Sequence, residues 1–363
     1  MDRLYDPAWA ASWDAVGLVS GDPEAEVDRI LFAVDPVAAT AREAIECGAQ
    51  LLVTHHPLFL TPVHGVAANS DKGRLVHELI RAGVALFVAH TNADSADPGV
   101  SDALAAALGL KELRPLSAAP ADPLDKIVIF VPHADADRVL DALAAAGAGA
   151  IGYYSRCAWL GTGTGTFLPG QAAHPAIGAP GTVERVPETR LEMVLPRARR
   201  ADVRAALLAS HPYEEPAYDV LELAALPGSR GTGRIGVLPE PMPLVSFVEH
   251  VARSLPAQPA GIRAAGDLAR TVREVAVCGG AGDSLLGTAA AAGVDAYVTA
   301  DLRHHKVSEH LEAGGPPVLD AGHWATEWPW LGAAADLLTL ALAQPVTTMV
   351  STLVTDPWSL RAD

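Results

Sequence analysis

Cysteines are few in this 363-residue sequence, and they are not grouped. The three are Cys47, Cys157 and Cys278, which are far apart, and no CxxC pair occurs. This pattern argues against a disulfide framework and against a cysteine-based zinc site. We expect three buried apolar thiols in a reducing compartment.

Positive charge and long apolar runs are also scarce. The sequence has 43 acidic and 26 basic residues, which gives a formal net charge of -17 at pH 7. Such a chain repels phosphate backbones and anionic lipids, so general nucleic-acid binding and membrane-surface binding are disfavoured. No apolar run approaches the roughly 18 residues of a membrane span, and the first residues do not resemble a secretion signal. We therefore expect a soluble, cytoplasmic protein.

Hydrophobic residues, by contrast, make up half of the sequence, which is enough for well-filled cores. Much of that fraction is alanine, a strong helix former, so helices are expected to be plentiful. The length exceeds that of one ordinary domain, which predicts two domains.

The first and last thirds both alternate apolar strands with helical stretches. Predicted strands are residues 29–35, 50–54, 84–89, 272–278, 296–299, 317–319 and 347–354. Predicted helices are residues 37–47, 71–81, 100–108, a stretch ending at 292, 306–312 and 325–341. This alternation predicts an α/β fold with a mostly parallel sheet covered by helices. The two thirds look like an imperfect duplication, so we expect two pseudo-symmetric halves that form one main domain.

The middle of the sequence has a different pattern. Residues 115–123 and 227–233 are rich in Pro, Gly, Ala or Ser and are predicted to be linkers. Between them we predict strands at 126–131, 190–195 and 217–223, helices at 134–146 and 198–210, and glycine-rich turns through Gly181. Two β-α-β units predict an inserted ferredoxin-like α+β domain over 124–226. The main domain then comprises residues 1–123 and 227–363.

Adjacent histidines directly follow a predicted strand. Because neighbouring side chains of an extended segment point to opposite sides, His55 and His56 could serve two metal ions. Imidazole suits zinc, iron and other borderline divalent ions. The alternative is a histidine pair that caps the strand by hydrogen bonds, and the pair alone does not decide between the two.

Two more strand ends carry histidine or carboxylate side chains. Asp94 follows strand 84–89; it can bridge two ions, although aspartate is also common in turns and helix caps. His323 and Glu327, four residues apart, share one face of a predicted helix, as surface pairs also do. Because ligand groups gather at the carboxyl ends of parallel strands, the three places together predict one metal site.

Other polar residues near strand ends have less specific patterns. His90, His304 and His305 are candidates for proton transfer, and support of the metal ligands is the alternative for them. Gly280, Gly282 and Ser284 lie between a strand and a helix, where their amides could hold a phosphate. A tight strand-to-helix turn explains these three equally well.

Taken together, these residues resemble the NIF-three-like family, whose members are often named GTP cyclohydrolase 1 type 2 homologues. The matching stretches are WDAVGL at 13–18, THHP at 54–57, HTNAD at 90–94, GGAGD at 279–283, TAD at 299–301 and GHWATE at 322–327. The middle resembles the PII-like insert of long bacterial members, through GAG at 147–149, GTGTF at 163–167 and HPYEE at 211–215. Family members usually have a helix before the Trp-Asp stretch. We expect that helix to be shortened or lost here, and the sequence to begin downstream of the natural start.

The resemblance implies a dinuclear divalent-metal site, a toroidal homohexamer and a nucleotide or other small-molecule ligand. The implied ligands are His55, His56, Asp94, His323 and Glu327, and the ions could be zinc, iron, manganese or magnesium. We expect Glu327, and as a second candidate Asp94, to bridge the ions. His55 and His323 should then serve one ion, and His56 and Asp94 the other.

Two functions are compatible with this site. One is a metal-dependent hydrolase of the GTP cyclohydrolase type, in which metal-activated water attacks a guanine ring carbon. The other is a non-enzymatic metal-handling or regulatory protein. The same residues serve both, so the sequence leaves the choice open.

Overall fold

The computed structural model describes residues 1–362 and divides the chain into two compact units. Unit 1 comprises Met1–Ala119 and Ser229–Asp363, and unit 2 is Pro120–Gly228. Each unit has its own sheets and its own buried core. Among the described residues, no helix has both the length and the apolar character needed to cross a membrane.

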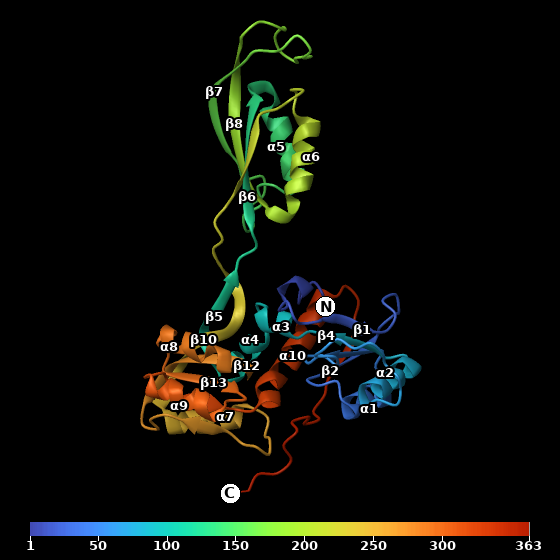
Figure 1. Cartoon of the computed structure of the whole chain (residues 1–363), viewed down its shortest axis with the longest axis vertical. Helices are drawn as coiled ribbons and strands as arrows, with labels where there is room; N and C mark the ends of the chain where they lie inside the picture. The colour runs from blue at the N-terminus through green and yellow to red at the C-terminus, as the bar shows by residue number, and fades with distance from the viewer. Residues whose placement is uncertain (363) are drawn as a thin grey trace. The chain divides into compact units, whose positions relative to one another are not determined.

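The first sheet of unit 1 has the strand order β1-β4-β3-β2-β15. Its strands are β1 (Gly17–Ser20), β2 (Arg29–Ala33), β3 (Leu51–Thr54), β4 (Ala85–Val88) and β15 (Thr347–Val350). All run parallel except β1, which is antiparallel to β4. Helices α1 (Ala38–Glu46) and α2 (Asp71–Ala82) cover one face, where their apolar side chains meet Leu31, Leu52 and Leu86 (Figure 1).

The second sheet of unit 1 has the order β11-β14-β13-β12-β10-β5. Its strands are β5 (Lys111–Pro120), β10 (Pro227–Pro243), β11 (Arg263–Ala265), β12 (Thr271–Ala281), β13 (Ala296–Ala300) and β14 (Val318–Asp320). The three central strands β12, β13 and β14 are parallel to one another. Helices α4 (Val100–Ala107) and α7 (Leu244–Ser254) share a core with one face. Helices α8 (Leu286–Ala292) and α9 (His304–Glu312) share a core with the other.

Helix α10 (His323–Ala341) lies between the two sheets (Figure 1). It contacts β2 and β15 of the first sheet, and β12, β13 and α4 on the other side. Its side chains Trp330 and Leu331 pack on Phe32 and Val53 of the first sheet. Burial on both sides explains why this helix is apolar nearly all round. The core thus fixes the first turns of α10 where the two sheets meet.

Unit 2 is a single antiparallel sheet in the order β7-β8-β6-β9, with both helices on one face (Figure 1). Its elements are β6 (Leu124–Pro132), α5 (Ala136–Ala145), β7 (Trp159–Phe167), β8 (Glu184–Pro196), α6 (Arg200–Ser210) and β9 (Tyr218–Glu222). The remaining short elements of the chain are η1 (Pro7–Trp9), α3 (Thr91–Ser95), η2 (His133–Asp135), η3 (Arg197–Arg199) and η4 (Asp283–Leu285).

Three segments predicted to be irregular are strands, so those predictions were wrong. Residues 115–120 lie in β5, residues 227–233 lie in β10, and the glycine-rich stretch of unit 2 contains β7. Proline is tolerated in β5 because this strand is at the edge of its sheet. On the outer side of an edge strand, no backbone N–H is needed to donate to a neighbouring strand. In β10 and β7 pairing with a neighbouring strand outweighs the low strand propensity of glycine.

Arg234 of β10 is a buried guanidinium that joins this strand to α4. It is 2% exposed, and its Nε donates to Asp102 Oδ1 at 2.8 Å. Its Nη1 donates to the carbonyls of Gly231 and Gly233, and its Nη2 donates to that of Ala96. Removing the guanidinium would take this donor from Asp102 Oδ1 and from all three backbone carbonyls.

We predict that Arg234→Met lowers the free energy of unfolding of unit 1 by about 3–5 kcal/mol, because it leaves the Asp102 carboxylate without its cation. The control is Arg253→Met, which removes an exposed arginine 3.8 Å from Glu249 and should change stability by about 0.5 kcal/mol or less. Urea unfolding followed by tryptophan fluorescence measures both. Equal midpoints for the two variants would contradict this role of Arg234.

Candidate metal centre

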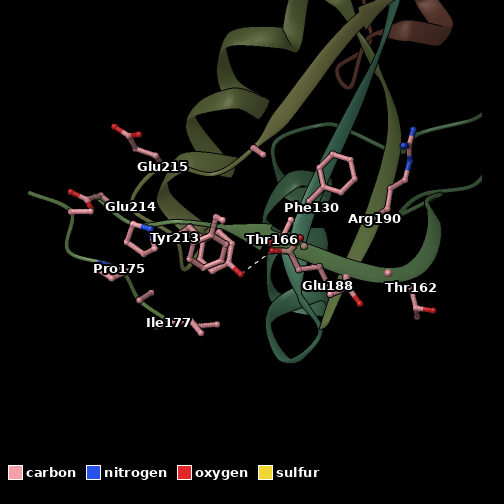
Figure 2. Close-up of a pocket in the computed structure, with 18 of the residues that line it drawn as sticks. Phe130, Thr162, Thr166, Pro175, Ile177, Glu188, Arg190, Tyr213, Glu214 and Glu215 are labelled. Carbon is pink, nitrogen blue, oxygen red and sulfur yellow. Dashed lines mark hydrogen bonds between the residues drawn. The ribbon is translucent and has the colours of Figure 1, made fainter. Parts of the chain in front are cut away.

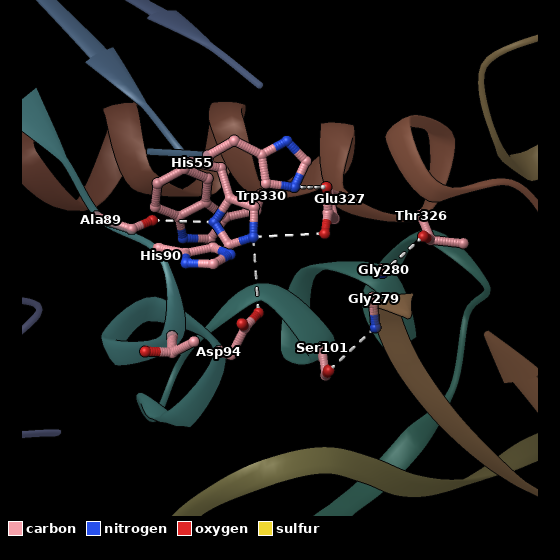
Figure 3. A network of polar contacts seen from close by, with 12 residues as sticks. His55, Ala89, His90, Asp94, Ser101, Gly279, Gly280, Thr326, Glu327 and Trp330 are labelled. Atoms are coloured by element: carbon pink, nitrogen blue, oxygen red, sulfur yellow. Dashed lines mark hydrogen bonds and ion pairs between the residues drawn. The ribbon is translucent and has the colours of Figure 1, made fainter. Parts of the chain in front are cut away.

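The predicted ligand residues come together where the two sheets of unit 1 meet at α10. His55 and His56 follow β3. His90 immediately precedes α3, which follows β4 and contains Asp94. His323 and Glu327 lie at the start of α10. All three segments follow the carboxyl end of a parallel strand, where the fold leaves side chains free to converge. Figure 3 shows His55 between Glu327 and Asp94.

Each of the four imidazoles is held by its Nδ1 atom. His55 Nδ1 donates to the Ala89 carbonyl at 2.9 Å. The other three Nδ1 atoms donate to carboxylates: His56 to Asp35 at 2.7 Å, His90 to Asp14 at 3.0 Å, and His323 to Asp301 at 2.7 Å. An Nδ1–H held in this way leaves Nε2 as the atom that can bind a metal ion, which is the arrangement commonly found around metal-bound histidines.

The Nε2 atoms converge on the carboxylate of Glu327. His323 Nε2 lies 3.0 Å from Oε1, His55 Nε2 lies 3.4 Å from Oε1, and His56 Nε2 lies 3.1 Å from Oε2. His56 Nε2 and His323 Nε2 are themselves only 3.1 Å apart. Asp94 Oδ1 lies 3.7 Å from His55 Nε2 on the other side.

This packing requires positive charge at its centre. Glu327 is 3% exposed, and its Oε2 receives no hydrogen bond from any described residue. Two Nε2 lone pairs and a carboxylate at these distances repel one another unless protons or metal ions lie between them. Imidazole nitrogen with carboxylate oxygen is a donor set suited to divalent transition metals, so the residues fit a metal ion.

The same need for positive charge appears in the pKa values of the site. Burial lowers the pKa of His56 and His323, but Glu327 and the Nδ1 carboxylates outweigh it and raise the values to about 10 and about 11. Burial raises the pKa of Glu327, yet the surrounding imidazoles bring it well below its usual range. Burial raises the pKa of Asp94 to about 6.

His90 differs from the other three histidines. Burial and the nearby His55 lower its pKa to about 4, despite the Asp14 carboxylate at its Nδ1. Its ring contacts those of His55 and His56 at centroid distances of 5.2 and 5.7 Å. His55, His56 and His90 form one group of nitrogen atoms close enough to share an ion, and His56, His323 and Glu327 form another.

The structure pairs the ligands differently from the expectation. His56 lies beside His323, and His55 lies beside Asp94. The reason is the direction of the two adjacent side chains. His55 points toward β4 and α3, where Ala89 holds its ring, and His56 points toward α10 and the second sheet.

The remaining predicted site residues belong to neither group of possible ligands. His304 and His305 are exposed in the first turn of α9 and belong to neither group. Gly280 N–H donates to Thr326 Oγ1 at 3.0 Å, and the Gly282 carbonyl accepts from Tyr297. These are contacts of a tight strand-to-helix turn, and Ser284 is exposed beside it.

Gly280 has a further role that the sequence did not indicate. Its φ is +65°, and a Cβ there would lie 2.3 Å from Glu327 Oε1 and 3.1 Å from His323 Nε2. Only glycine therefore lets β12 approach the cluster this closely. Sequence reasoning also gave no role to Asp14, Asp35 and Asp301, although each lies within a stretch that it had singled out.

Two cavities open beside the cluster within unit 1. One, of about 760 Å³, is lined by His56, His90 and His323 together with Trp13, Lys72 and Arg74. The other, of about 880 Å³, is lined by His56, Asp301 and His323 together with Arg263 and Trp358. Both volumes are in the range of small-molecule sites.

Comparison with known proteins gives consistent matches over the whole chain. The model of the Duf34/NIF3 (NGG1p interacting factor 3) family matches residues 1–357. A GTP cyclohydrolase 1 type 2 homolog of Mycobacterium tuberculosis is 53% identical, covering 99% of this chain and 95% of that protein. One from Streptomyces coelicolor is 39% identical, covering 99% and 91%.

Solved structures agree with the sequence matches. A Bacillus cereus protein related to NIF3 superposes with a TM-score of 0.82 at 36% identity, over 99% of this chain and 96% of that one. A Staphylococcus aureus protein superposes with a TM-score of 0.85 at 25% identity, with the same coverage. The mixed α/β architecture of this chain is thus shared with these structures.

We predict that the metal-free protein loses stability as pH rises from about 6.5 to about 10. The folded pKa values of His56 and His323 are raised above the unfolded value, so the folded state binds more protons in this range. Bound metal replaces those protons, so the metal-loaded protein should gain stability between pH 6 and 8. Urea unfolding at pH 7 and pH 9, with and without chelator, measures both. A metal-free protein that is more stable at pH 9 would contradict the prediction.

Proposed function

The chain belongs to the Duf34/NIF3 family, and we propose that it binds two divalent metal ions in the cluster around Glu327. The observation that carries the proposal is the buried Glu327 carboxylate facing three imidazole Nε2 atoms that are each fixed by an Nδ1 hydrogen bond. Among the described residues, no lysine or arginine forms an ion pair with Glu327. Its negative charge therefore has to be offset by bound protons or metal ions.

The ligand groups suggest how two ions would be shared. His55 with Asp94 would hold one ion, and His56 with His323 the other. Glu327 would serve both ions, because its carboxylate faces the Nε2 atoms of His55, His56 and His323. A shared carboxylate offsets the repulsion between two neighbouring cations. Zinc, iron, manganese and magnesium are the candidate ions.

We propose further that the protein is a metal-dependent hydrolase acting on a nucleotide, with GTP as the named candidate. A bound divalent ion would supply Lewis-acid activation of water and of a substrate oxygen. Support comes from the names of its relatives and from the cavity of about 760 Å³ beside the cluster. Lys72 and Arg74 line that cavity and offer positive charge to a phosphate, and Trp13 offers an aromatic face to a base.

His90 has a specific part in this proposal. Its low pKa keeps the imidazole neutral near pH 7, and Asp14 holds its Nδ1–H. Its Nε2 lone pair then faces the cluster beside His55 and His56, where it would serve as a further ligand. With this pKa it is a weak proton acceptor near pH 7.

A non-enzymatic metal-handling or regulatory function is the second candidate. The observation in its favour is the glycine-rich loop, since the Gly280 amide is engaged by Thr326 and the loop packs on β13. The loop therefore adds no phosphate-binding amide at Gly280. Metal binding is common to both functions, and only turnover separates them.

We also propose how the domains of the chain are built and how copies of it assemble. The β-α-β-β-α-β order of unit 2, with its sheet order β7-β8-β6-β9, supports an inserted ferredoxin-like, PII-like domain. The parallel strands β2-β3-β4 and β12-β13-β14 support two pseudo-symmetric halves of the main domain. The family resemblance supports a toroidal homohexamer of a cytoplasmic protein.

We predict that Glu327→Gln removes at least one of two ions per chain, because an amide cannot offset the charge of two cations. Metal content of the purified protein, measured by mass spectrometry after dialysis, tests this. The matched control is Glu249→Gln. Glu249 is an exposed glutamate of α7 that is not a predicted ligand, so this variant should retain both ions. Two ions per chain in folded Glu327→Gln protein would refute the bridging role.

We also predict that the metal-loaded protein releases formate from GTP. Addition of one water opens the guanine imidazole ring and leaves its C8 carbon as a formamide, and a second hydrolysis releases that carbon as formate and leaves an amine. Formate is measured after loading with magnesium, manganese, iron or zinc, and Glu327→Gln should abolish its release. Formate no higher than in a chelated control, with all four metals, would refute cyclohydrolase activity. Metal binding with no turnover would instead favour the metal-handling function.

A further inference from the structure

Unit 2 contains a cavity of about 860 Å³ that the metal site does not explain. Two motifs singled out in the sequence line it: residues 163–167 of β7 and residues 211–215 before β9. The connection between β7 and β8 forms a further wall, which includes Pro175 and Ile177 (Figure 2). Two motifs distant in sequence thus converge on one cavity.

The floor of this cavity is a stripe of bare backbone on β7. Gly161, Gly163 and Gly165 alternate along the strand, so all three face the same side of the sheet. The Trp159 ring covers Gly161, and the Glu188 carboxylate covers Gly165, as a Cβ at either position would clash with them. A Cβ at Gly163 would meet nothing within 4 Å, so the space between the indole and the carboxylate is open.

Glu188 is a buried carboxylate that forms no ion pair with any of residues 1–362. It is 7% exposed, and its Oε1 accepts a hydrogen bond from Tyr213 Oη at 2.8 Å (Figure 2). No lysine or arginine of the described residues forms an ion pair with it. A carboxylate held this way retains acceptor capacity and attracts a cation into the cavity.

The surroundings of Glu188 add to the negative potential. Glu214 and Glu215 also line the cavity, and the Glu214 carboxylate accepts from the His174 amide at 3.0 Å. The cationic lining residue Arg190 is already engaged, since its Nε donates to Glu192 at 2.8 Å and its guanidinium lies over the Phe130 ring. The cavity therefore favours positive charge.

Aromatic faces complete the lining. Trp159 is 57% exposed, and Phe167 packs edge-on against Tyr213 with ring centroids 5.6 Å apart. Aromatic rings beside an unmatched carboxylate attract a cation with an apolar body, through the ring faces and the charge together. An anion would meet three glutamates here and be repelled.

We propose that this cavity binds a small organic cation, an amine with an aromatic or apolar body, whose ammonium group pairs with Glu188 and whose body lies over Gly163 beside Trp159. The position of the amine follows from the carboxylate, and that of its body follows from the gap above Gly163. Neither depends on the metal site of unit 1.

Calorimetric titration of the full-length protein with phenethylamine tests the proposal, and 3-phenylpropionate is the matched anion. We expect the amine to bind and the carboxylate, which has a similar size and the same ring, to bind at least about tenfold more weakly. Binding of both with equal affinity, or of neither at millimolar concentration, would overturn the proposal.

Two variants locate the site without disturbing the fold. Glu188→Gln keeps an acceptor for Tyr213 and removes the charge, so amine binding should weaken by about tenfold or more. Gly163→Val fills the open space with a residue that favours strands, so binding should be lost. The control is Gly287→Val on α8 of unit 1, where a Cβ also meets nothing within 4 Å, and it should bind like the parent protein.

Size-exclusion chromatography with light scattering distinguishes a ligand site from a contact between copies of the chain. Gly163→Val should leave the molar mass of the assembly unchanged. A variant that loses both amine binding and the parent's assembly would identify the cavity as an interface between copies and overturn the proposal.

Discussion

The main domain is organised around one buried carboxylate, that of Glu327 on α10. Three imidazole Nε2 atoms lie within 3.4 Å of its oxygens. Two belong to histidines that follow β3, and one belongs to a histidine of α10 itself. None of these groups carries a permanent positive charge. The arrangement is therefore stable only with bound protons or metal ions, and binding one or the other couples the site to the stability of the fold.

Helix α10 transmits this constraint to both sheets. Its middle packs Trp330 and Leu331 on the first sheet, and its first turns meet β12 at Gly280. The Thr326 hydroxyl accepts from the Gly280 amide and so fixes the second sheet to the same turn that carries Glu327. A shift of either sheet would move a ligand, which is why a helix buried on both faces is a suitable carrier for the site.

The fold brings together the residues that the sequence singled out as candidate ligands, and each of them belongs to a short local pattern. His55 and His56 directly follow an apolar strand, and His323 and Glu327 share a helix face. The carboxylates that orient these rings were not predicted, since Asp14, Asp35 and Asp301 are related to the histidines only through the fold. Most parallel strands were predicted within a few residues. Strands β5, β7 and β10 were missed because their proline and glycine are tolerated only through pairing with specific neighbours.

Three buried carboxylates, those of Asp125, Glu327 and Glu188, differ in how their charge is matched. Asp125 of unit 2 is fully buried, yet Arg197 and Arg200 each donate to it, at 3.0 and 2.7 Å. Its charge is matched by groups that are always cationic, so nothing further needs to bind. Glu327 faces imidazoles whose charge depends on protons, and Glu188 has only the Tyr213 hydroxyl. Both are left with a charge that the protein itself does not match permanently, and this is the physical reason for assigning a cation to each of them, a metal ion to the first and an amine to the second.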